Sequence, residues 1–572
     1  MVRWRTVVTA VILLSLWPLL ALAQETEAYR AFPLVGSRVA VWVIAQLHLM
    51  FAAFVLAVPI FAVIVEYMGM RLKNPKFDRL AREFTKLLFA AFSTTAILGA
   101  ILLFTLIGLY PKFFTYLSSI FFPTMWLYAV LFFGETFSLY LYWHTWDRLQ
   151  DRKRLHLTLG LMVNFFGTVL MVIANSWLTF MTSPAGVDVT GKLINLWAAI
   201  NNPTWMAINI HRFIANISFG GAICGAYAAY KFLGAKSDEE RAHYDWMGYI
   251  GNFIAISALI FLPFAGYLLG RELYDFNQQM GIMAMGGFLS WLWIIQAILI
   301  GILFLGSNYY LWLGMERIKG GERYRRYIKY LMILLAGGFL VWATPHSLVA
   351  SLEEARKIGT AYHPLLGVLG VMSAKNTAVN IMILTTFVSF LLYRRANKEA
   401  VVSWEKLGKV AQAGLLAISG GIVIYLGIYG YFVEAIVRIG FSVYQVISVL
   451  TAMVLVGGID LLLYRGARIT GAFQWGKIAV RSQYTLVLLA ITFTWLMGLM
   501  GYFRSAIRQH WHVYGIIRDT SPDAFSPTLG YAANVVSVTT VIFLGFLLFI
   551  FWLGGLGDKK PARPRETGKG KG

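Results

Sequence analysis

Long apolar segments, separated by short polar connections, follow one another through almost the whole sequence. About 13 such segments can be counted, at 39–68, 85–109, 122–143, 157–181, 211–232, 247–269, 286–311, 330–350, 365–393, 410–431, 442–464, 484–503 and 535–553. An apolar run of about 20 residues can cross the hydrocarbon core of a bilayer as an α-helix. Such runs are far too long for the strands of a membrane barrel. The pattern therefore predicts an all-α, polytopic membrane protein with about 13 spans.

Composition and charge agree with a membrane protein. Hydrophobic residues make up 59% and charged residues 13% of the chain, and the mean hydropathy is +0.67. The net charge of +22 would suggest a nucleic-acid partner in a soluble protein. Here the cations gather in alternate connections, including 71–82, 148–154, 231–241, 317–326, 394–398 and 465–481. Cation-rich connections stay in the cytoplasm, so we expect no nucleic acid and a multi-pass protein of the bacterial inner membrane.

The two ends of the chain have their own signals. A basic start, an apolar run and the small residues Ala21 and Ala23 predict a signal peptide over 1–23, with an uncleaved anchor as the alternative. The N-terminus is then outside, and the basic tail 557–572 is cytoplasmic. The single cysteine, Cys224, excludes intrachain disulfides, thiolate zinc sites and cysteine-held iron–sulfur clusters.

Two histidines lie inside apolar segments near the predicted outer face. His211 ends a polar, aromatic stretch and opens an apolar run, and His48 lies near the start of the first segment after the signal. Ionisable groups within membrane segments are costly and usually functional. A neutral imidazole offers a lone pair to a metal and an N–H to a second acceptor. We therefore expect His48 and His211 to ligate haem iron.

Other histidines fall in the predicted connections. His363 precedes a proline, and His510 and His512 flank Trp511 on the outer side. Each is a candidate cofactor ligand, but His363 can equally cap a helix, and the other two can belong to an interfacial loop with aromatic anchors. The histidines expected at the cytoplasmic face, and read as ordinary interface residues, are His144, His156 and His243.

Five charged side chains lie within or at the ends of apolar segments. Glu66 and Glu135 can be kept neutral or share a proton, and so relay protons, although either could be a carboxylate at the membrane edge. Lys375 needs an anion, such as a haem propionate, or backbone carbonyls, unless it snorkels. Arg438 and Arg508 lie at outer helix ends, where they could hold a cofactor or contact lipid headgroups.

Several stretches resemble subunit I of the cytochrome bd-type quinol oxidases. The run from Leu47-His48 to Glu66 resembles the family's first helix, whose histidine binds a high-spin haem. The run from Asn202 to His211 resembles its fifth helix, whose histidine ligates low-spin haem b. Gly134-Glu135 resembles its third helix, where an acid lies on the proton path. Further similar stretches are 174–184, 437–440 and 501–515.

The sequence also departs from that family. The methionine ligand of the low-spin haem falls at Gly440, the first acid of the third helix at Leu127, and the glutamate ligand of the second high-spin haem near Ser505 or Ala506. His363, and His510 or His512, are the candidate replacements. The hydrophilic quinol loop is replaced by about four spans. The resemblance implies a haem-binding part at 39–270, an inserted four-helix segment at 271–430 and C-terminal helices at 431–556.

Three functions remain open on these residues. The first is an enzyme subunit of a bd-like terminal oxidase, which passes electrons from quinol or another donor through haem b to a high-spin haem b or d that reduces O₂ to water. The second is an electron-transfer subunit between the quinone pool and a partner cytochrome. A second membrane subunit is expected in the first case. A transporter without a cofactor is a third interpretation.

Overall fold

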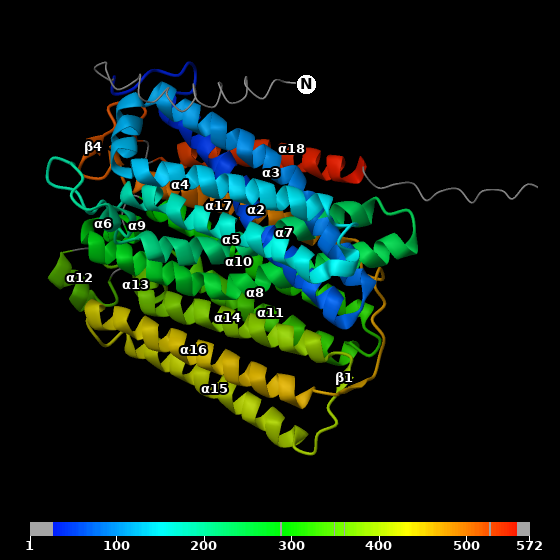
Figure 1. The fold of residues 1–572 in the computed structure, drawn as a ribbon. Helices are drawn as coiled ribbons and strands as arrows, with labels where there is room; N and C mark the ends of the chain where they lie inside the picture. Colours follow the sequence, from blue (N-terminus) through cyan, green and yellow to red (C-terminus); the bar gives the residue numbers. More distant parts are fainter. Residues whose placement is uncertain (1–26, 287–288, 348, 360, 526–527, 557–572) are drawn as a thin grey trace, which may run out of the picture.

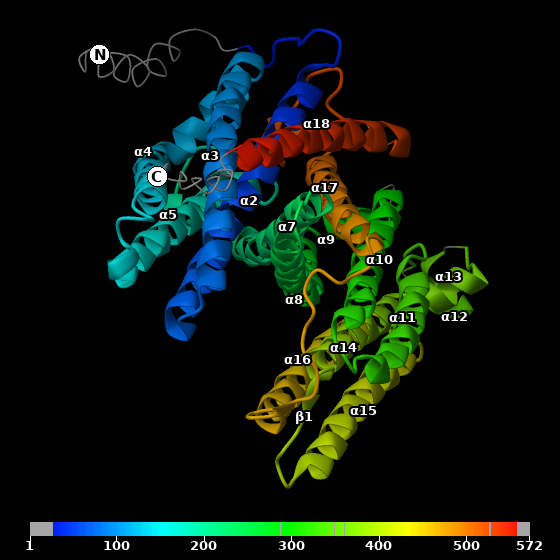
Figure 2. The ribbon, with the colours of Figure 1, turned by 90° about the vertical axis from the view of Figure 1, so that its right-hand side faces the viewer.

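The computed structural model describes residues 27–556, apart from 287–288, 348, 360 and 526–527. The predicted signal peptide and basic tail lie outside the described residues. Long helices lie side by side in one bundle (Figures 1 and 2). The helices are α2 (Ser37–Leu72), α3 (Pro75–Leu109), α4 (Pro111–His144), η2 (Gln150–Arg152), α5 (Lys153–Phe180), α6 (Leu196–Ile200), α7 (Trp205–Leu233), α8 (Asp238–Phe276), α9 (Gln278–Gly286), α10 (Ser290–Gly314), η3 (Met315–Arg317), α11 (Glu322–Trp342), α12 (Leu352–Ile358), α13 (Pro364–Leu369), α14 (Met372–Arg395), α15 (Glu405–Tyr429), α16 (Ala435–Leu463), α17 (Arg481–Ala506) and α18 (Leu529–Leu556).

The predicted fold class is confirmed, because 12 of the described helices are long and apolar enough to cross a membrane. The helix that completes the predicted count is α11. Its first half is too polar for it to be counted among these 12 helices, because it carries Arg325, Arg326 and Lys329. It nevertheless packs between α10 and α14 and lies alongside them in the bundle (Figure 1). Within the described residues the bundle therefore contains 12 long apolar helices and one long helix, α11, whose first half is polar.

Two predicted spans have wrong boundaries. The span at 330–350 ends as a helix at Trp342, because Thr344 precedes Pro345 and a residue before proline disfavours helical backbone. The span at 365–393 is two helices, α13 and α14, with Gly370 at the end of the first and extended backbone at Val371. At both places the helical backbone ends although the sequence stays apolar, so the apolar pattern alone did not predict these helix ends.

The two ends of the bundle differ. The short helices α6, α9, α12 and α13 and the hairpin of β3 (Trp511–Val513) and β4 (Ile517–Arg518) gather at one end, called here the hairpin end (Figure 1). At the opposite end β1 (Lys398–Glu399) pairs antiparallel with β2 (Arg468–Ile469). We call this the basic end, because the cation-rich connections lie there.

Helix α2 is the centre of the bundle's first half. It packs against α3, α5, α7, α17 and α18, and Met50, Phe51, Ala57 and Val58 are fully buried. Close approach to α7 depends on Gly220, where an added Cβ would lie 2.7 Å from the Cβ of Ala57. Helices α14, α15 and α16 form the opposite flank, and α15 exposes an apolar face that suits contact with lipid, including Ile418, Ile422 and Tyr425.

A buried ion pair joins the two halves near the basic end. The guanidinium of Arg317, fully buried, donates from Nε and Nη2 to both carboxylate oxygens of Asp245, at 2.9 and 2.7 Å. Its remaining N–H groups reach the hydroxyls of Tyr393 and Tyr310, at 2.9 and 2.7 Å. Because these partners lie on α8, α10 and α14, the pair fixes how those helices meet.

Candidate functional site

His48 lies on α2 and faces α3. Its Nδ1 is 3.0 Å from the carbonyl oxygen of Thr95. A carbonyl only accepts, so Nδ1 carries the proton and Nε2 of the neutral ring keeps its lone pair. Gly99 lies beside the ring, and an added Cβ there would be 2.9 Å from Cε1. This is the arrangement in which a histidine is oriented through one nitrogen and ligates a metal through the other.

His211 lies in the second turn of α7 and faces α8. Gly266 of α8 lies beside the ring, and an added Cβ there would be 4.0 Å from Nε2 and Cδ2. The glycine leaves this edge of the ring free of side-chain bulk. No hydrogen bond of the His211 ring is present among the described residues, so its nitrogens are available to a ligand.

The two imidazoles lie at the same depth of the bundle. Helices α2 and α7 both run from the hairpin end to the basic end, and Gly220 packs on Ala57. His211 and His48 each stand nine residues before that contact. Nine residues are about two and a half helical turns, so both rings project away from the α2–α7 interface, toward α8 and α3. The structure thus offers two separate ligands at one level, not one shared site.

Glu66 belongs to a fully buried cluster near the basic end. Its Oε2 accepts from the Tyr142 hydroxyl at 2.8 Å, and its Oε1 lies 2.6 Å from Nδ1 of His156. Nε2 of His156 is 2.8 Å from the carbonyl of Tyr142 and must donate to it. One proton therefore lies between Glu66 and His156, on either the carboxyl or the imidazole. Lys153 lies 3.6 Å from Oε1 and 2.6 Å from Asp78.

This cluster corrects one prediction. His156 is not an ordinary interface residue, because both of its nitrogens have hydrogen-bond partners and one partner is a buried carboxyl. The interface role of His144 and His243 stays a prediction; their rings lie 4.3 Å from Tyr140 and 5.0 Å from Tyr244. The sequence did not indicate this role, because His156 directly follows the cation-rich connection between α4 and α5, where an exposed residue is expected.

Glu135 lies between the levels of His48 and Glu66. It is buried on α4 against Gly167 of α5, where an added Cβ would be 2.7 Å from Oε1 and 3.1 Å from a methyl of Leu56. Leu56 is eight residues from His48 and ten from Glu66 along α2. At about 1.5 Å per residue, Glu135 is roughly 12 Å of helix axis from the first and 15 Å from the second. The described residues give Glu135 no ion pair or hydrogen bond.

The loop histidines lie elsewhere on the hairpin end. His363 is exposed and is the N-cap residue of α13, where its Nδ1 accepts from the Leu366 N–H at 3.3 Å. Helix α13 packs on α14, whereas α7 packs on α2, α5, α8 and α17. The exposed ring of His510 meets Phe525 edge-on at 5.5 Å. His512 is stacked on Phe113 at 4.6 Å.

The candidate cations on this end bind protein groups. Lys375 donates to the Trp342 carbonyl at 2.8 Å and to the Thr344 carbonyl, at the end of α11. Arg438 donates to the Gly430 carbonyl and to the Glu354 carboxylate, both at 2.7 Å. Arg508 donates to the carbonyl of His512 at 2.6 Å, and burial holds its pKa well below the usual value. Lys375 therefore links α14 to the end of α11, and Arg438 links α16 to the end of α15 and to α12.

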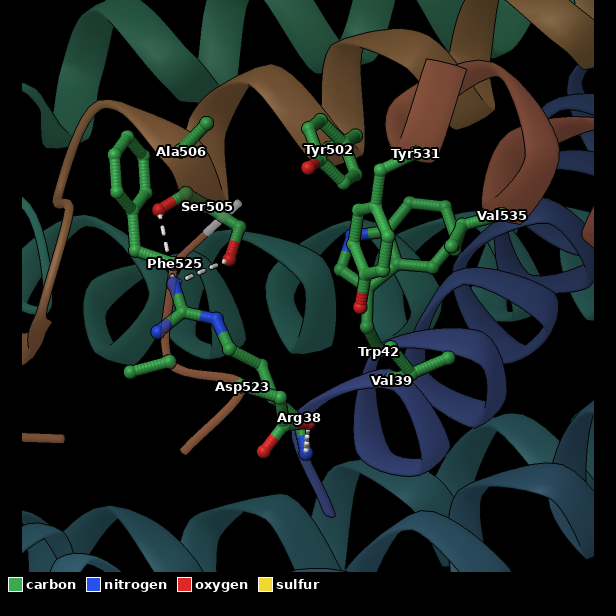
Figure 3. A pocket seen from close by; sticks show the side chains of 11 residues that line it. Arg38, Val39, Trp42, Tyr502, Ser505, Ala506, Asp523, Phe525, Tyr531 and Val535 are labelled. Carbon is green, nitrogen blue, oxygen red and sulfur yellow. Dashed lines mark hydrogen bonds between the residues drawn. The ribbon is translucent and has the colours of Figure 1, made fainter. Parts of the chain in front are cut away.

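Two small cavities lie near α2. One, of about 30 Å³, lies at the hairpin end between α2, α17 and α18; Arg38 lies at its edge and donates to the backbone oxygen and Oγ of Ser505 (Figure 3). The other, of about 10 Å³, is lined by Leu56, Phe213 and Asn216 among other residues. A water molecule needs about 10–15 Å³, so these are water-sized spaces. Neither cavity is lined by His48 or His211, and both of these residues are half-buried.

Together these features define a polytopic helical membrane protein. It has two single imidazoles near one end, one of them oriented by a hydrogen bond, and buried proton-sharing groups near the other. Residues 37–304 match the sequence model of the family "cytochrome bd terminal oxidase subunit I". Over these residues the chain is a cytochrome bd subunit I-type protein. No curated protein matches the chain.

A solved structure, "The structure of bd oxidase from Geobacillus thermodenitrificans", is similar at 16% sequence identity with a TM-score of 0.40. The similarity covers 75% of this chain and 96% of that one. The family match spans 268 of the 572 residues and makes this part of the chain similar to a bd-type oxidase subunit. It implies haem cofactors in general, and a subunit of this type generally works in the membrane with a second subunit and quinol.

Proposed function

We propose that this chain is the haem-bearing subunit of a bd-like terminal oxidase, with His211 ligating low-spin haem b and His48 ligating a high-spin haem. The observation that carries the proposal is the tautomer of His48. Its Nδ1–H is fixed on the Thr95 carbonyl, so Nε2 is the ligating atom. A haem iron takes one or two axial ligands from the protein, so single imidazoles suffice.

When bound, the haems supply electron transfer and, at the high-spin iron, O₂ reduction. The chain's own residues hold and move protons. Glu66, His156 and Tyr142 receive protons at the basic end, and Glu135 stands on the same face of α4 two turns from Tyr142, toward the level of His48. Quinol or another outer donor supplies the electrons.

The proposal includes an orientation. The basic end faces the cytoplasm of a bacterium and the hairpin end faces outward, because cation-rich connections are retained inside. Both imidazoles then lie toward the outer half of the inner membrane, and proton delivery runs along α2 and α4 from the cytoplasm. A second membrane subunit completes the complex.

The second candidate is an electron-transfer subunit without O₂ chemistry. It is favoured by the positions that should carry further iron ligands. Gly440 has no side chain, and the Oγ of Ser505 is bound by Arg38 at 3.1 Å. His363, His510 and His512 remain predictions for replacement ligands, although the geometry of His363 suits a helix cap.

Reduced-minus-oxidised and CO-difference spectra of the purified complex test the proposal. We expect a low-spin b-type signal and a CO-reactive high-spin signal. His48→Ala removes the CO-reactive signal and His211→Ala removes the low-spin one. Colourless protein refutes haem binding altogether. Haem that quinol analogues reduce, without O₂ uptake, selects the electron-transfer subunit instead.

A further inference from the structure

Two arginines from different helices converge on one turn of α5. Nη1 of Arg212, on α7, donates to Oδ1 of Asn175 at 2.5 Å. Nη1 of Arg504, on α17, donates to the carbonyl of Leu178 at 3.2 Å. Asn175 and Leu178 are three residues apart and therefore lie on the same face of α5. The two guanidinium groups thus lie between α5, α7 and α17, and the charge of Arg504 acts on Arg212.

No anion balances these charges within the described residues. The partners of Arg212 and Arg504 are a neutral amide and a backbone carbonyl, and neither arginine is in an ion pair there. Arg508 adds a third cation one turn beyond Arg504 and also binds a carbonyl. The buried carboxylate that acts on Arg508, Asp519, already accepts from Arg38 at 2.9 Å. Like charges held together away from water repel strongly unless an anion joins them.

The position of Arg212 identifies the kind of anion. It follows His211 directly in the helix, and its charge acts on both His211 and His48. A guanidinium fork matches a carboxylate with two parallel hydrogen bonds. The carboxylates that a haem on either imidazole would bring to this level are its propionates.

We propose that Arg212 and Arg504 form a carboxylate-binding clamp for a haem propionate between α5, α7 and α17. The clamp rests on the proposed haem function and adds to it two residues that no sequence motif indicated. It also gives a reason for two half-buried arginines that have no acidic partner in the described part of the chain. Holding a cation close to the haem stabilises the reduced form, since reduction adds negative charge.

The test compares Arg212→Gln, Arg504→Gln and the exposed control Arg271→Gln, whose ion pair with Asp275 lies on the surface of α8. Haem content and the midpoint potential of each haem are measured by spectroelectrochemistry on the purified complex. We expect at least a tenfold shift toward the oxidised form at fixed potential for one haem, about 59 mV for one electron. The haem that shifts, low-spin or high-spin, identifies whose propionate is held.

Arg212→Lys and Arg504→Lys keep the charge and separate a clamp from a packing role. If a glutamine variant loses haem while its helix content stays normal, the lysine variant should regain haem. Haem loss that lysine does not restore, or potentials equal to wild type in both glutamine variants, overturns the clamp. Wild-type protein without haem would instead refute the proposed function, which is a different result.

Discussion

Replacing Glu66 by glutamine removes a titratable group from the basic end of the bundle but keeps its hydrogen bonds. The amide oxygen of Gln can accept from Tyr142, as Oε2 does now at 2.8 Å. Its NH₂ can donate to Nδ1 of His156, whose Nε2–H is fixed on the Tyr142 carbonyl. Lys153 keeps Asp78 as a partner at 2.6 Å. Glu66→Gln is therefore close to isosteric.

The expected effects of substituting Glu66 on the free energy of unfolding and on the rate of proton transfer differ in size. A hydrogen bond to a charged group contributes about 1.5–3 kcal/mol and a neutral one about 0.5–1.5 kcal/mol, so Glu66→Gln should cost about 1 kcal/mol for each bond. Glu66→Ala strands the Tyr142 hydroxyl and His156 in a dry site and should cost about 3–5 kcal/mol. If Glu66 relays protons, Glu66→Gln should slow turnover by about 10²–10⁴-fold, the usual contribution of a positioned acid or base.

The assay measures O₂ uptake and haem spectra with an artificial donor, together with thermal unfolding in the same detergent. The relay predicts slow turnover of Glu66→Gln with intact haem signals and a loss of stability of only about 2 kcal/mol, from its two altered hydrogen bonds. Glu239→Gln is the matched control, since that carboxylate is exposed at the same end and 3.6 Å from Arg79. Wild-type turnover in Glu66→Gln, within twofold, would refute the relay and leave Glu66 a structural acceptor.

Gly99→Ala places a methyl group 2.9 Å from Cε1 of His48, so the high-spin haem signal should fall several-fold in absorbance spectra while the low-spin signal stays. Asp245→Asn removes the charge that pairs with fully buried Arg317 and should cost about 3–5 kcal/mol of unfolding free energy, seen as a lower midpoint of thermal unfolding. Burial lowers the pKa of His512 to about 4, from an ordinary 6.5, so its folded form favours the neutral ring. Stability should be complete above about pH 6.5 and fall by up to about 1.4 kcal/mol per unit toward pH 4; His512→Gln should flatten that slope in unfolding curves.

Each of these has a contrary outcome. A normal high-spin spectrum in Gly99→Ala would mean that His48 does not ligate. Glu316→Gln, at a partly exposed ion pair with Arg325, should change stability by less than about 1 kcal/mol. An equal loss in that control and in Asp245→Asn would show that burial of the pair does not matter. An unchanged pH slope in His512→Gln would place the acid sensitivity in other groups.

The apolar pattern predicted the fold class because lipid leaves few alternatives. A chain that must satisfy its backbone in hydrocarbon forms helices, and their length and number can be read from the apolar runs. The same pattern failed at 343–350 and at Gly370, where backbone preferences of Pro345 and Gly370 interrupt segments that remain apolar. Hydrophobicity reports the solvent around a segment and not the conformation of each residue.

Side-chain partners could not be predicted in the same way. His156 and Glu66 are 90 residues apart, and Arg212 and Arg504 reach one turn of α5 from two helices. Lys375 and Arg438 were candidates for a cofactor, but in the folded chain backbone carbonyls and Glu354 occupy them. These pairings depend on helix rotation and level, which no periodicity within one segment specifies.

The sequence by itself determined that this is a bundle of membrane helices, which ends carry the cations, and that His48 and His211 interrupt apolar runs. Only the tertiary structure decided the proton on His48, the helix that each imidazole faces and the proton shared by Glu66 and His156. The physical reason is that burial is a property of a residue with its solvent, whereas ligation and proton sharing are properties of pairs, and the pairs form only when the helices pack.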